Sequence, residues 1–254
     1  RSGDVNHPFP EEHHRKAITA VARLHLAPTP EAQAHLLHEG VAAVDAPVVG
    51  NTVIDALWWM RKRLDGTELD HLGLPTNRTL VLLTCHRRES QGRPMRRALD
   101  AVAEVAAARA DELCVVVPVH PNPVVSEAVR DRLSNIPGVA LVEPLDYRTM
   151  VALLSAGRMV VTDSGGLQEE APALGLPVLV LREKTERPEG VAAGGVELVG
   201  TDPDAIQRGM ERILDSPVSA AVGAECSSPY GDGLASARVT DALLGRKPTQ
   251  FRPE

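Results

Sequence analysis

From residue 79 onward, short and almost continuously apolar segments alternate with longer segments of helical character. The apolar segments are 79–84, 113–118, 139–142, 159–162, 177–181 and 196–199, and the helical ones are about 95–110, 123–134, 147–156, 166–174 and 203–215. Strands that are apolar on both faces are typical of parallel sheets covered by helices on each side. The sequence therefore predicts an α/β fold built on a doubly wound parallel sheet.

The composition agrees with this fold and limits the partners. Hydrophobic residues make up 43% of the 254 residues and aromatic residues only 2%, so Val, Leu, Ala and Ile must form the core. The formal net charge of −7 argues against a general nucleic-acid partner, and an anionic ligand would need a local positive site. No apolar run approaches a membrane-spanning length and no signal peptide is visible, so we expect no membrane contact and a cytoplasmic location.

No metal site or cofactor is expected. The cysteines are Cys85, Cys114 and Cys226, and their odd number and wide spacing argue against a disulfide framework or a zinc site. Cys85 and Cys114 lie in or beside apolar strands and are expected to be reduced core residues. The run 11–14 (Glu-Glu-His-His) is discounted as a metal site, because a helix points adjacent residues toward different faces.

The two ends of the chain differ from the sheet region. Residues 1–49 are predicted to contain helices at about 11–24 and 30–39 and short strands at 25–27 and 47–49, without a sheet of their own. Residues 51–63 are expected to form a helix in which Trp58 and Trp59 serve packing. A last helix is expected at about 234–244, and the polar tail 247–254 is expected to fray.

Unusual polar segments follow the predicted strands. They are residues 85–90, 118–123, 143–147, 162–166 and 182–190. Ligands of open α/β sheets bind outside the carboxyl ends of the strands, so these segments are expected to meet at one rim. Each segment alone is weak evidence, and their common location is what predicts a binding site.

Ser164, Gly165 and Gly166 stand between an apolar strand and a predicted helix, where free backbone N–H groups can hold an anion such as a diphosphate. The alternative is an ordinary N-cap serine followed by two permissive glycines. Glu169 and Glu170 follow within one turn and favour a ligand, because a carboxylate accepts hydrogen bonds from two vicinal hydroxyls of a ribose. Their alternative is the preference for acidic residues in the first turn of a helix.

Three further features allow both a functional and a structural interpretation. Residues 86–89 (His-Arg-Arg-Glu) bring cations that suit phosphate to the end of a strand, or form a solvated loop with an internal Arg–Glu pair. His120 is held between prolines and could be aimed at a ligand, although a lone histidine is more often structural. Residues 182–190 carry three acids and three bases and could be a charged surface loop or part of the rim.

Together these segments resemble the non-hydrolysing UDP-N-acetylglucosamine 2-epimerases. The similar stretches run in order along almost the whole chain: Gly3-Asp4 with residues 10–12, residues 28–29, 50–56, 84–89, 118–123, 162–174, 175–179, 185–190 and 198–200, and an altered 228–233. The resemblance implies a two-domain, GT-B-like fold. Residues 1–49 would be the end of an N-terminal Rossmann-like domain, 50–225 the UDP-binding domain, and 226–254 a return helix and tail.

The resemblance also implies roles for single residues. Ser164, Gly165 and Gly166 would hold the diphosphate, Glu170 the ribose, and Arg187 the substrate. Leu145 and Met150, from the segment 145–150, would line the uracil pocket, and His86 would lie near the phosphates as a catalytic residue. A second UDP-N-acetylglucosamine would act as an allosteric activator at a site formed by Arg88, His120, Glu11 and Glu12.

The implied reaction converts UDP-N-acetylglucosamine into UDP-N-acetylmannosamine. UDP is eliminated from C1 as C2 loses its proton, and UDP then adds back to 2-acetamidoglucal with protonation of the opposite face. The resemblance places the main catalytic carboxylates upstream of Arg1, so the 254 residues alone are expected to bind UDP weakly and not to epimerise. It also implies a homodimer for the full-length form.

Other functions stay open at this point. A GT-B glycosyltransferase could use the same UDP site with an acceptor, and a non-catalytic UDP-binding fragment or subunit would show binding without turnover. A hydrolysing epimerase would release free N-acetylmannosamine. The sequence does not distinguish the pathway, the oligomeric state or an allosteric response.

Overall fold

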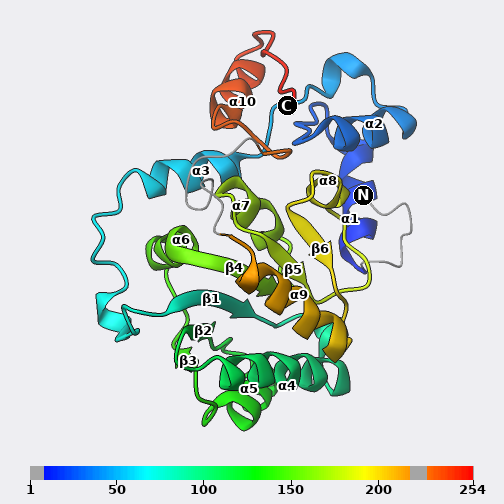
Figure 1. Cartoon of the computed structure of the whole chain (residues 1–254). Helices are drawn as coiled ribbons and strands as arrows, with labels where there is room; N and C mark the ends of the chain where they lie inside the picture. The colour runs from blue at the N-terminus through cyan, green and yellow to red at the C-terminus, as the bar shows by residue number, and fades with distance from the viewer. Residues whose placement is uncertain (1–8, 218–227, 254) are drawn as a thin grey trace. The chain divides into compact units, whose positions relative to one another are not determined.

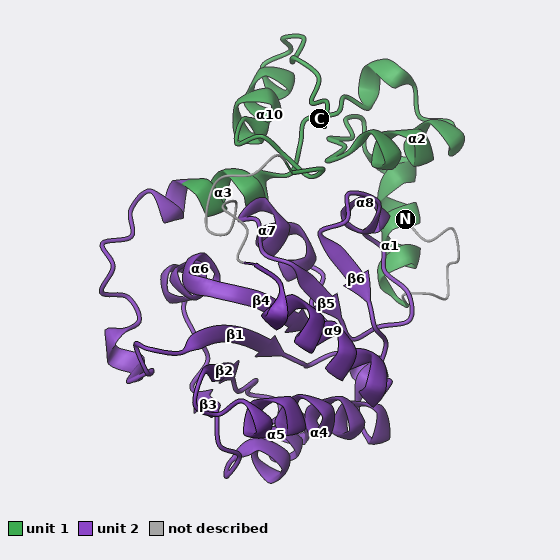
Figure 2. Ribbon diagram, viewed as in Figure 1, with its two compact units in different colours: residues 1–58, 227–254 green, residues 59–226 purple. Residues whose placement is uncertain are grey.

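The computed structural model describes residues 9–217 and 228–253. The chain divides into two compact units, one formed by residues 1–58 and 227–254 and the other by residues 59–226 (Figure 2). We call them the terminal unit and the sheet unit. Residues 50–58, which the sequence interpretation grouped with the UDP-binding domain, fall within the terminal unit.

The sheet unit contains a six-stranded, entirely parallel sheet of order β3-β2-β1-β4-β5-β6 (Figure 1). The strands are β1 (Thr79–Thr84), β2 (Leu113–Pro118), β3 (Val139–Val142), β4 (Gly157–Thr162), β5 (Val178–Val180) and β6 (Val196–Leu198). The chain winds outward from β1 to β3 and then returns to add β4 beside β1. The predicted α/β fold with a doubly wound parallel sheet is confirmed.

Helices cover both faces of this sheet. One face carries α4 (Arg93–Ala108), α5 (Pro123–Leu133) and α9 (Pro203–Asp215), and α4 packs against both of the others. The helix α6 (Tyr147–Ala156) packs against β1 and β4, and α7 (Leu167–Ala173) packs against β4 and β5. The short α8 (Pro188–Ala192) packs against β6. The helix α8 lies at the end of the charged segment 182–190, which the sequence did not predict to be helical.

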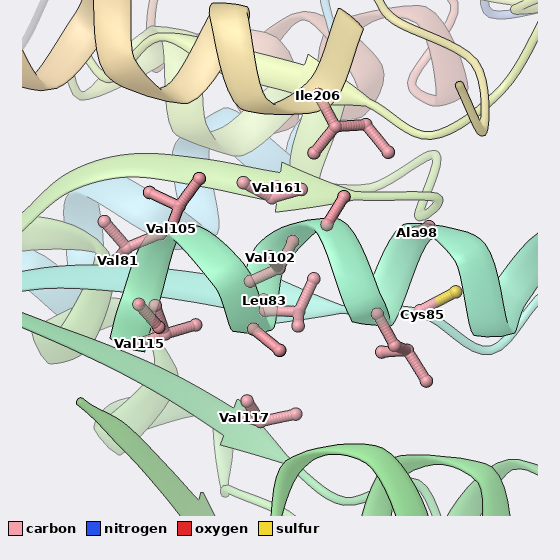
Figure 3. Close-up of a cluster of buried hydrophobic side chains, with 14 of the residues drawn as sticks. Val81, Leu83, Cys85, Ala98, Val102, Val105, Val115, Val117, Val161 and Ile206 are labelled. Carbon is pink, nitrogen blue, oxygen red and sulfur yellow. The ribbon is translucent and has the colours of Figure 1, made fainter. Parts of the chain in front are cut away.

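The core of the sheet unit consists of branched aliphatic side chains and alanines. Figure 3 shows alternate residues of β1, such as Val81 and Leu83, in one cluster with Val102 and Val105 of α4 and Ile206 of α9. The strand period of two sends these side chains to one face and leaves Leu82 for the other. Cys85 and Cys114 are free and buried, as expected, whereas Cys226 lies outside the described residues.

The terminal unit is helical. It contains α1 (Glu11–Val21), α2 (Pro30–His38), most of α3 (Thr52–Arg61) and α10 (Ala235–Leu243). The strands predicted at 25–27 and 47–49 are wrong as strands, since only a single parallel bridge joins Ala27 to Val48.

The tail of the terminal unit is ordered, so the prediction that it frays is wrong for residues 247–253. The backbone N–H of Phe251 donates to the carbonyl of Val48, and the side chain of Gln250 accepts from the Val48 N–H. Phe251 is buried. Burial of this one aromatic ring, together with the two hydrogen bonds, outweighs the polar character of its neighbours.

Candidate functional site

A cavity of about 310 Å³ lies at the carboxyl edge of the sheet unit. Its lining residues follow β1, β2, β3 and β4, and β1 and β4 are the neighbours between which the winding of the sheet reverses. This position is where open α/β sheets bind ligands. The lining comprises Thr84, Cys85, His86, Pro118, Val119, His120, Pro121, Pro144, Leu145, Met150, Ser164, Leu167 and Glu170.

The turn after β4 carries Ser164, Gly165 and Gly166. The N-cap position of α7 is Gly166, and no side chain caps this end of the helix. The alternative of an ordinary N-cap serine is therefore wrong. Ser164 lines the cavity, and its backbone N–H donates to the hydroxyl of Thr162 at 2.9 Å.

Arg187 lies directly over this turn. A Cβ placed on Gly165 would stand 2.8 Å from Cζ of Arg187, so only glycine leaves room for the guanidinium at its present position. The Nε of Arg187 donates to Glu169 at 2.6 Å. The fold thus brings a cation from the segment 182–190 onto the glycines, and Glu169 holds this cation rather than lining the cavity.

Glu170 lines the cavity and is buried. Burial raises the pKa of this carboxyl, while a hydrogen bond from Tyr147 lowers it and the charge of Glu169 raises it. The Tyr147 hydroxyl donates to Oε1 of Glu170 at 3.0 Å, and burial followed by the charge of Glu170 raises the pKa of Tyr147. Tyr147 stands in the segment 145–150 that was predicted to line the uracil pocket, but its contact with Glu170 was not predicted.

His86 and His120 form a stacked pair in the cavity. Their ring centroids are 5.3 Å apart and the ring planes differ by 5°. The Nδ1 of His120 accepts a hydrogen bond from the backbone N–H of Asn122. The resemblance implied different roles for the two histidines, and the structure brings both to one wall of one cavity.

Asp163 lies beneath this wall and was overlooked as a site residue. It is fully buried, and its Oδ2 accepts from the backbone N–H groups of His86 and Arg87, both at 2.8 Å. Its Oδ1 lies 3.3 Å from Nδ1 of His86. A burial signal was present in the sequence, since Asp163 directly follows a continuously apolar strand.

Part of the cavity lining is apolar. Leu145 and Met150 line the cavity together with Pro144 and Leu167, so the two residues predicted for a base pocket do lie at the cavity. Leu145 directly follows Pro144 in the segment after β3, and Met150 comes from the first turn and a half of α6. A largely apolar lining with a few polar groups is common in small-molecule sites.

The residues predicted for a second ligand site belong to both units of the chain. His120 lines the cavity, whereas Arg88 is exposed in the 3₁₀ turn Arg88–Ser90. Glu11 and Glu12 belong to α1 of the terminal unit, where Arg15 forms an ion pair with the buried Glu12.

Within the described ranges, 9–217 and 228–253, no three His, Cys, Asp or Glu side chains form a group that could hold a metal ion. Among these same residues, no helix has the length and apolar character needed to cross a membrane.

The family description "UDP-N-acetylglucosamine 2-epimerase" matches residues 1–244. The chain belongs to the UDP-N-acetylglucosamine 2-epimerase family. A probable UDP-N-acetylglucosamine 2-epimerase of Ralstonia nicotianae is 46% identical over 250 residues, which are 96% of this chain and 66% of that protein. The chain thus spans about two-thirds of the length of this curated relative.

Solved structures of the UDP-N-acetylglucosamine 2-epimerase family share the fold. The Neisseria meningitidis enzyme bound to UDP-GlcNAc superimposes with a TM-score of 0.88 at 36% identity, covering 97% of this chain and 68% of that one. The S. aureus MnaA–UDP co-structure gives 0.88 at 37% identity, covering 99% and 70%. The resemblance deduced from the sequence and the GT-B-like fold class are confirmed.

Proposed function

We propose that a protein containing this chain interconverts UDP-N-acetylglucosamine and UDP-N-acetylmannosamine, and that this chain supplies its UDP-binding part. One observation carries the proposal. The cavity at the reversal point of the sheet combines the glycine turn, a buried carboxylate and an apolar wall, in a chain of the epimerase family. UDP offers a diphosphate, a ribose and a planar base to these three surfaces.

The diphosphate is assigned to Ser164, Gly165 and Gly166. No side chain caps the start of α7, and the guanidinium of Arg187 lies over the same turn. Guanidinium groups bind phosphate oxygens in a bidentate manner. Arg187 therefore supplies the local positive charge that a chain of net charge −7 needs for an anionic ligand.

The ribose is assigned to Glu170 and the uracil to Leu145 and Met150. Glu170 reaches the cavity from the first turn of α7, close to the proposed diphosphate site. The Tyr147 hydroxyl occupies its Oε1, so Oε2 is the oxygen placed to accept from a ribose hydroxyl. The apolar side chains of Leu145 and Met150 suit the flat faces of a base.

In the proposed reaction UDP leaves C1 as C2 loses its proton, and it returns after the glycal has been protonated on the other face. His86 acts beside the phosphates, where a donated proton stabilises the departing diphosphate. We expect these 254 residues alone to bind UDP weakly and not to epimerise.

Further parts of the proposal concern regulation and assembly. Arg88, His120, Glu11 and Glu12 are proposed to contact a second UDP-N-acetylglucosamine that acts as an activator. The full-length form is proposed to be a homodimer, and a cytoplasmic location stays a prediction.

Isothermal titration of the chain with UDP tests the proposal, with ADP as the control for a general diphosphate site. Specific binding of UDP is expected, and Glu170→Ala should weaken it about 10- to 100-fold, corresponding to one lost charge-assisted hydrogen bond of about 1.5–3 kcal/mol. Equal affinity for UDP and ADP would contradict the base pocket. Formation of UDP-N-acetylmannosamine is then assayed with a full-length protein that contains this chain. Release of free N-acetylmannosamine, or a requirement for a sugar acceptor, would overturn the epimerase assignment.

A further inference from the structure

Asp163 is a fully buried carboxylate beside the cavity residue His86. It is fully buried between the ends of β1 and β4, where it follows Thr162. One oxygen, Oδ2, accepts two backbone N–H groups, from His86 and Arg87. These bonds attach the start of the loop after β1 to the end of β4.

The second oxygen of Asp163 is the unusual feature. Oδ1 is buried and has no hydrogen bond of acceptable geometry among the described residues. The nitrogen Nδ1 of His86 lies 3.3 Å from it, within ion-pair distance but poorly aligned. An unsatisfied buried carboxylate oxygen is costly, so the side chain that can satisfy it by a small rotation is the one expected to do so.

We propose that Asp163 is a positioning residue for His86, holding its imidazole with the proton on Nδ1 and leaving Nε2 to face the UDP diphosphate. The inference rests on the proposed function for the ligand, but the contact between the two side chains stands by itself. Such an arrangement fixes both the tautomer and the orientation of a histidine through a hydrogen bond to its other nitrogen.

The surroundings of the ring support a fixed orientation. His120 stacks on one face of His86 at 5.3 Å, and its own Nδ1 is held by Asn122, so the stacked partner is fixed too. Two other titratable groups lie close to Asp163. Burial, followed by the charge of Asp163 and a hydrogen-bond interaction with it, raises the pKa of the Cys85 thiol. The hydrogen bond with Glu186 is the main cause that raises the pKa of Arg182, and the charge of Asp163 adds to it.

The arrangement has a consequence for the diphosphate. Between the Asp163 carboxylate on one side and a phosphate on the other, the imidazole gains from carrying protons on both nitrogens. His86 would then present a cation where the negative charge of the departing UDP develops. With an uncharged neighbour in place of Asp163, the same histidine can offer only a neutral N–H.

Nitrogen-15 NMR of His86 in the 254-residue chain tests the inference without turnover. The free protein should show the Nδ1–H tautomer at pH 8, and saturation with UDP at pH 7 should protonate both nitrogens. In Asp163→Asn the amide oxygen can keep the two backbone N–H groups, and its NH₂ then faces His86. The tautomer should switch to Nε2–H, and UDP should bind about 5- to 20-fold more weakly.

Asp202→Asn is the matched control, because Asp202 also accepts a backbone N–H, that of Ala205, far along the chain at the start of α9. It should leave the His86 signals and the UDP affinity unchanged. His86→Gln supplies a second test. If Asp163 acts through His86, Asp163→Asn should weaken UDP binding much less in that background than in the wild type.

An Nε2–H tautomer in the wild-type protein, or an unchanged tautomer in Asp163→Asn, would overturn the inference. So would equal effects of Asp163→Asn with and without His86, which would make Asp163 purely structural. If the wild type shows the Nδ1–H tautomer but binds no UDP, the proposed ligand is wrong while the contact between Asp163 and His86 holds.

Discussion

The phenol of Tyr147 donates a hydrogen bond across 3.0 Å to the buried carboxylate of Glu170. The two residues come from the first turns of α6 and α7, so the contact joins the segments that follow β3 and β4. It occupies one oxygen of Glu170 and leaves the other for a ligand. If Glu170 binds the ribose as proposed, this pair connects the ionisation of Glu170 to the binding of a sugar hydroxyl.

Tyr147→Phe should make UDP binding more sensitive to acid. Burial raises the pKa of Glu170 and the Tyr147 hydrogen bond opposes this rise, so removal of the hydroxyl should raise the pKa further. Since ribose hydroxyls bind the ionised carboxylate best, UDP affinity should fall as the pH drops through this pKa, beginning at a higher pH in the variant. Calorimetric titrations between pH 8 and 5 measure the effect, which Glu170→Gln should abolish. Parallel pH profiles in wild type and Tyr147→Phe would contradict the assignment.

Glu170→Gln should weaken UDP binding without weakening the fold. A carboxylate whose pKa is raised in the folded state contributes stability below its unfolded pKa and loses it as the pH rises through the folded pKa. Ionisation of Glu170 is therefore a net cost to the folded state, which glutamine avoids. Urea denaturation at pH 7 should show a midpoint no lower than that of the wild type. A clear loss of stability would mean that the carboxylate is structural.

Gly165→Ala should displace Arg187 and weaken UDP binding about tenfold, corresponding to the partial loss of one charge-assisted phosphate contact. The new Cβ would stand 2.8 Å from the guanidinium carbon, but the end of a flexible side chain can move, so the urea midpoint should change little. Arg187→Ala should cause a similar loss, and the double variant should lose no more than the larger single effect. If calorimetry shows that the two losses of UDP affinity add in the double variant, Gly165 and Arg187 act independently of each other.

Gly138→Ala should destabilise the sheet unit strongly, and Gly73→Ala provides the comparison. Both glycines have positive φ, +79° and +62°, which costs an alanine about 1–2 kcal/mol. At Gly138 the Cβ would also meet the carbonyl oxygen of Ala106 at 2.6 Å, whereas at Gly73 there is open space. We expect Gly138→Ala to cost at least about 2 kcal/mol more than Gly73→Ala in urea unfolding. Equal losses of unfolding free energy in the two variants would show that the backbone at the start of β3 moves to accommodate the new Cβ.

Acid should weaken the contact between Glu68 and Arg148. The backbone N–H of Asp65 and then Arg148 are the main groups that lower the pKa of Glu68, to about 2. A carboxyl whose pKa is lowered by folding stabilises above its unfolded pKa, and that contribution is lost as the pH falls toward the folded value. The difference in urea midpoint between wild type and Glu68→Gln should therefore be largest near neutral pH and shrink between pH 4.5 and 2. A difference that does not change with pH would contradict this origin.

The strands could be predicted because they are buried on both faces, so that consecutive residues are apolar. Segments such as 113–118 are apolar at nearly every position, and only a strand covered on both faces produces that pattern at this length. The rim followed from the same argument, since parallel strands end at one edge. The cavity residues Ser164, Glu170 and His86 were found in this way, and the family resemblance assigned their roles.

Contacts between distant segments could not be predicted from local patterns. The sequence shows Asp163 and His86 in different loops, and they meet only because β4 returns to lie beside β1. The bridge between Ala27 and Val48, and the attachment of Phe251, likewise depend on partners that no local period records. For this reason no role was predicted for Asp163, although it directly precedes Ser164 in the segment 162–166.

The attachment of the tail also affects how the chain matures during synthesis. Val48 and its partner Gln250 are separated by 202 residues, which a ribosome adds in about 10 to 40 s at ordinary rates. The strands of the sheet unit are all synthesised within that interval, whereas the terminal unit has to wait for its final segment. Val48 therefore spends this time without its partners in the tail, and this is the interval in which a chaperone or protease would most readily act on the newly made chain.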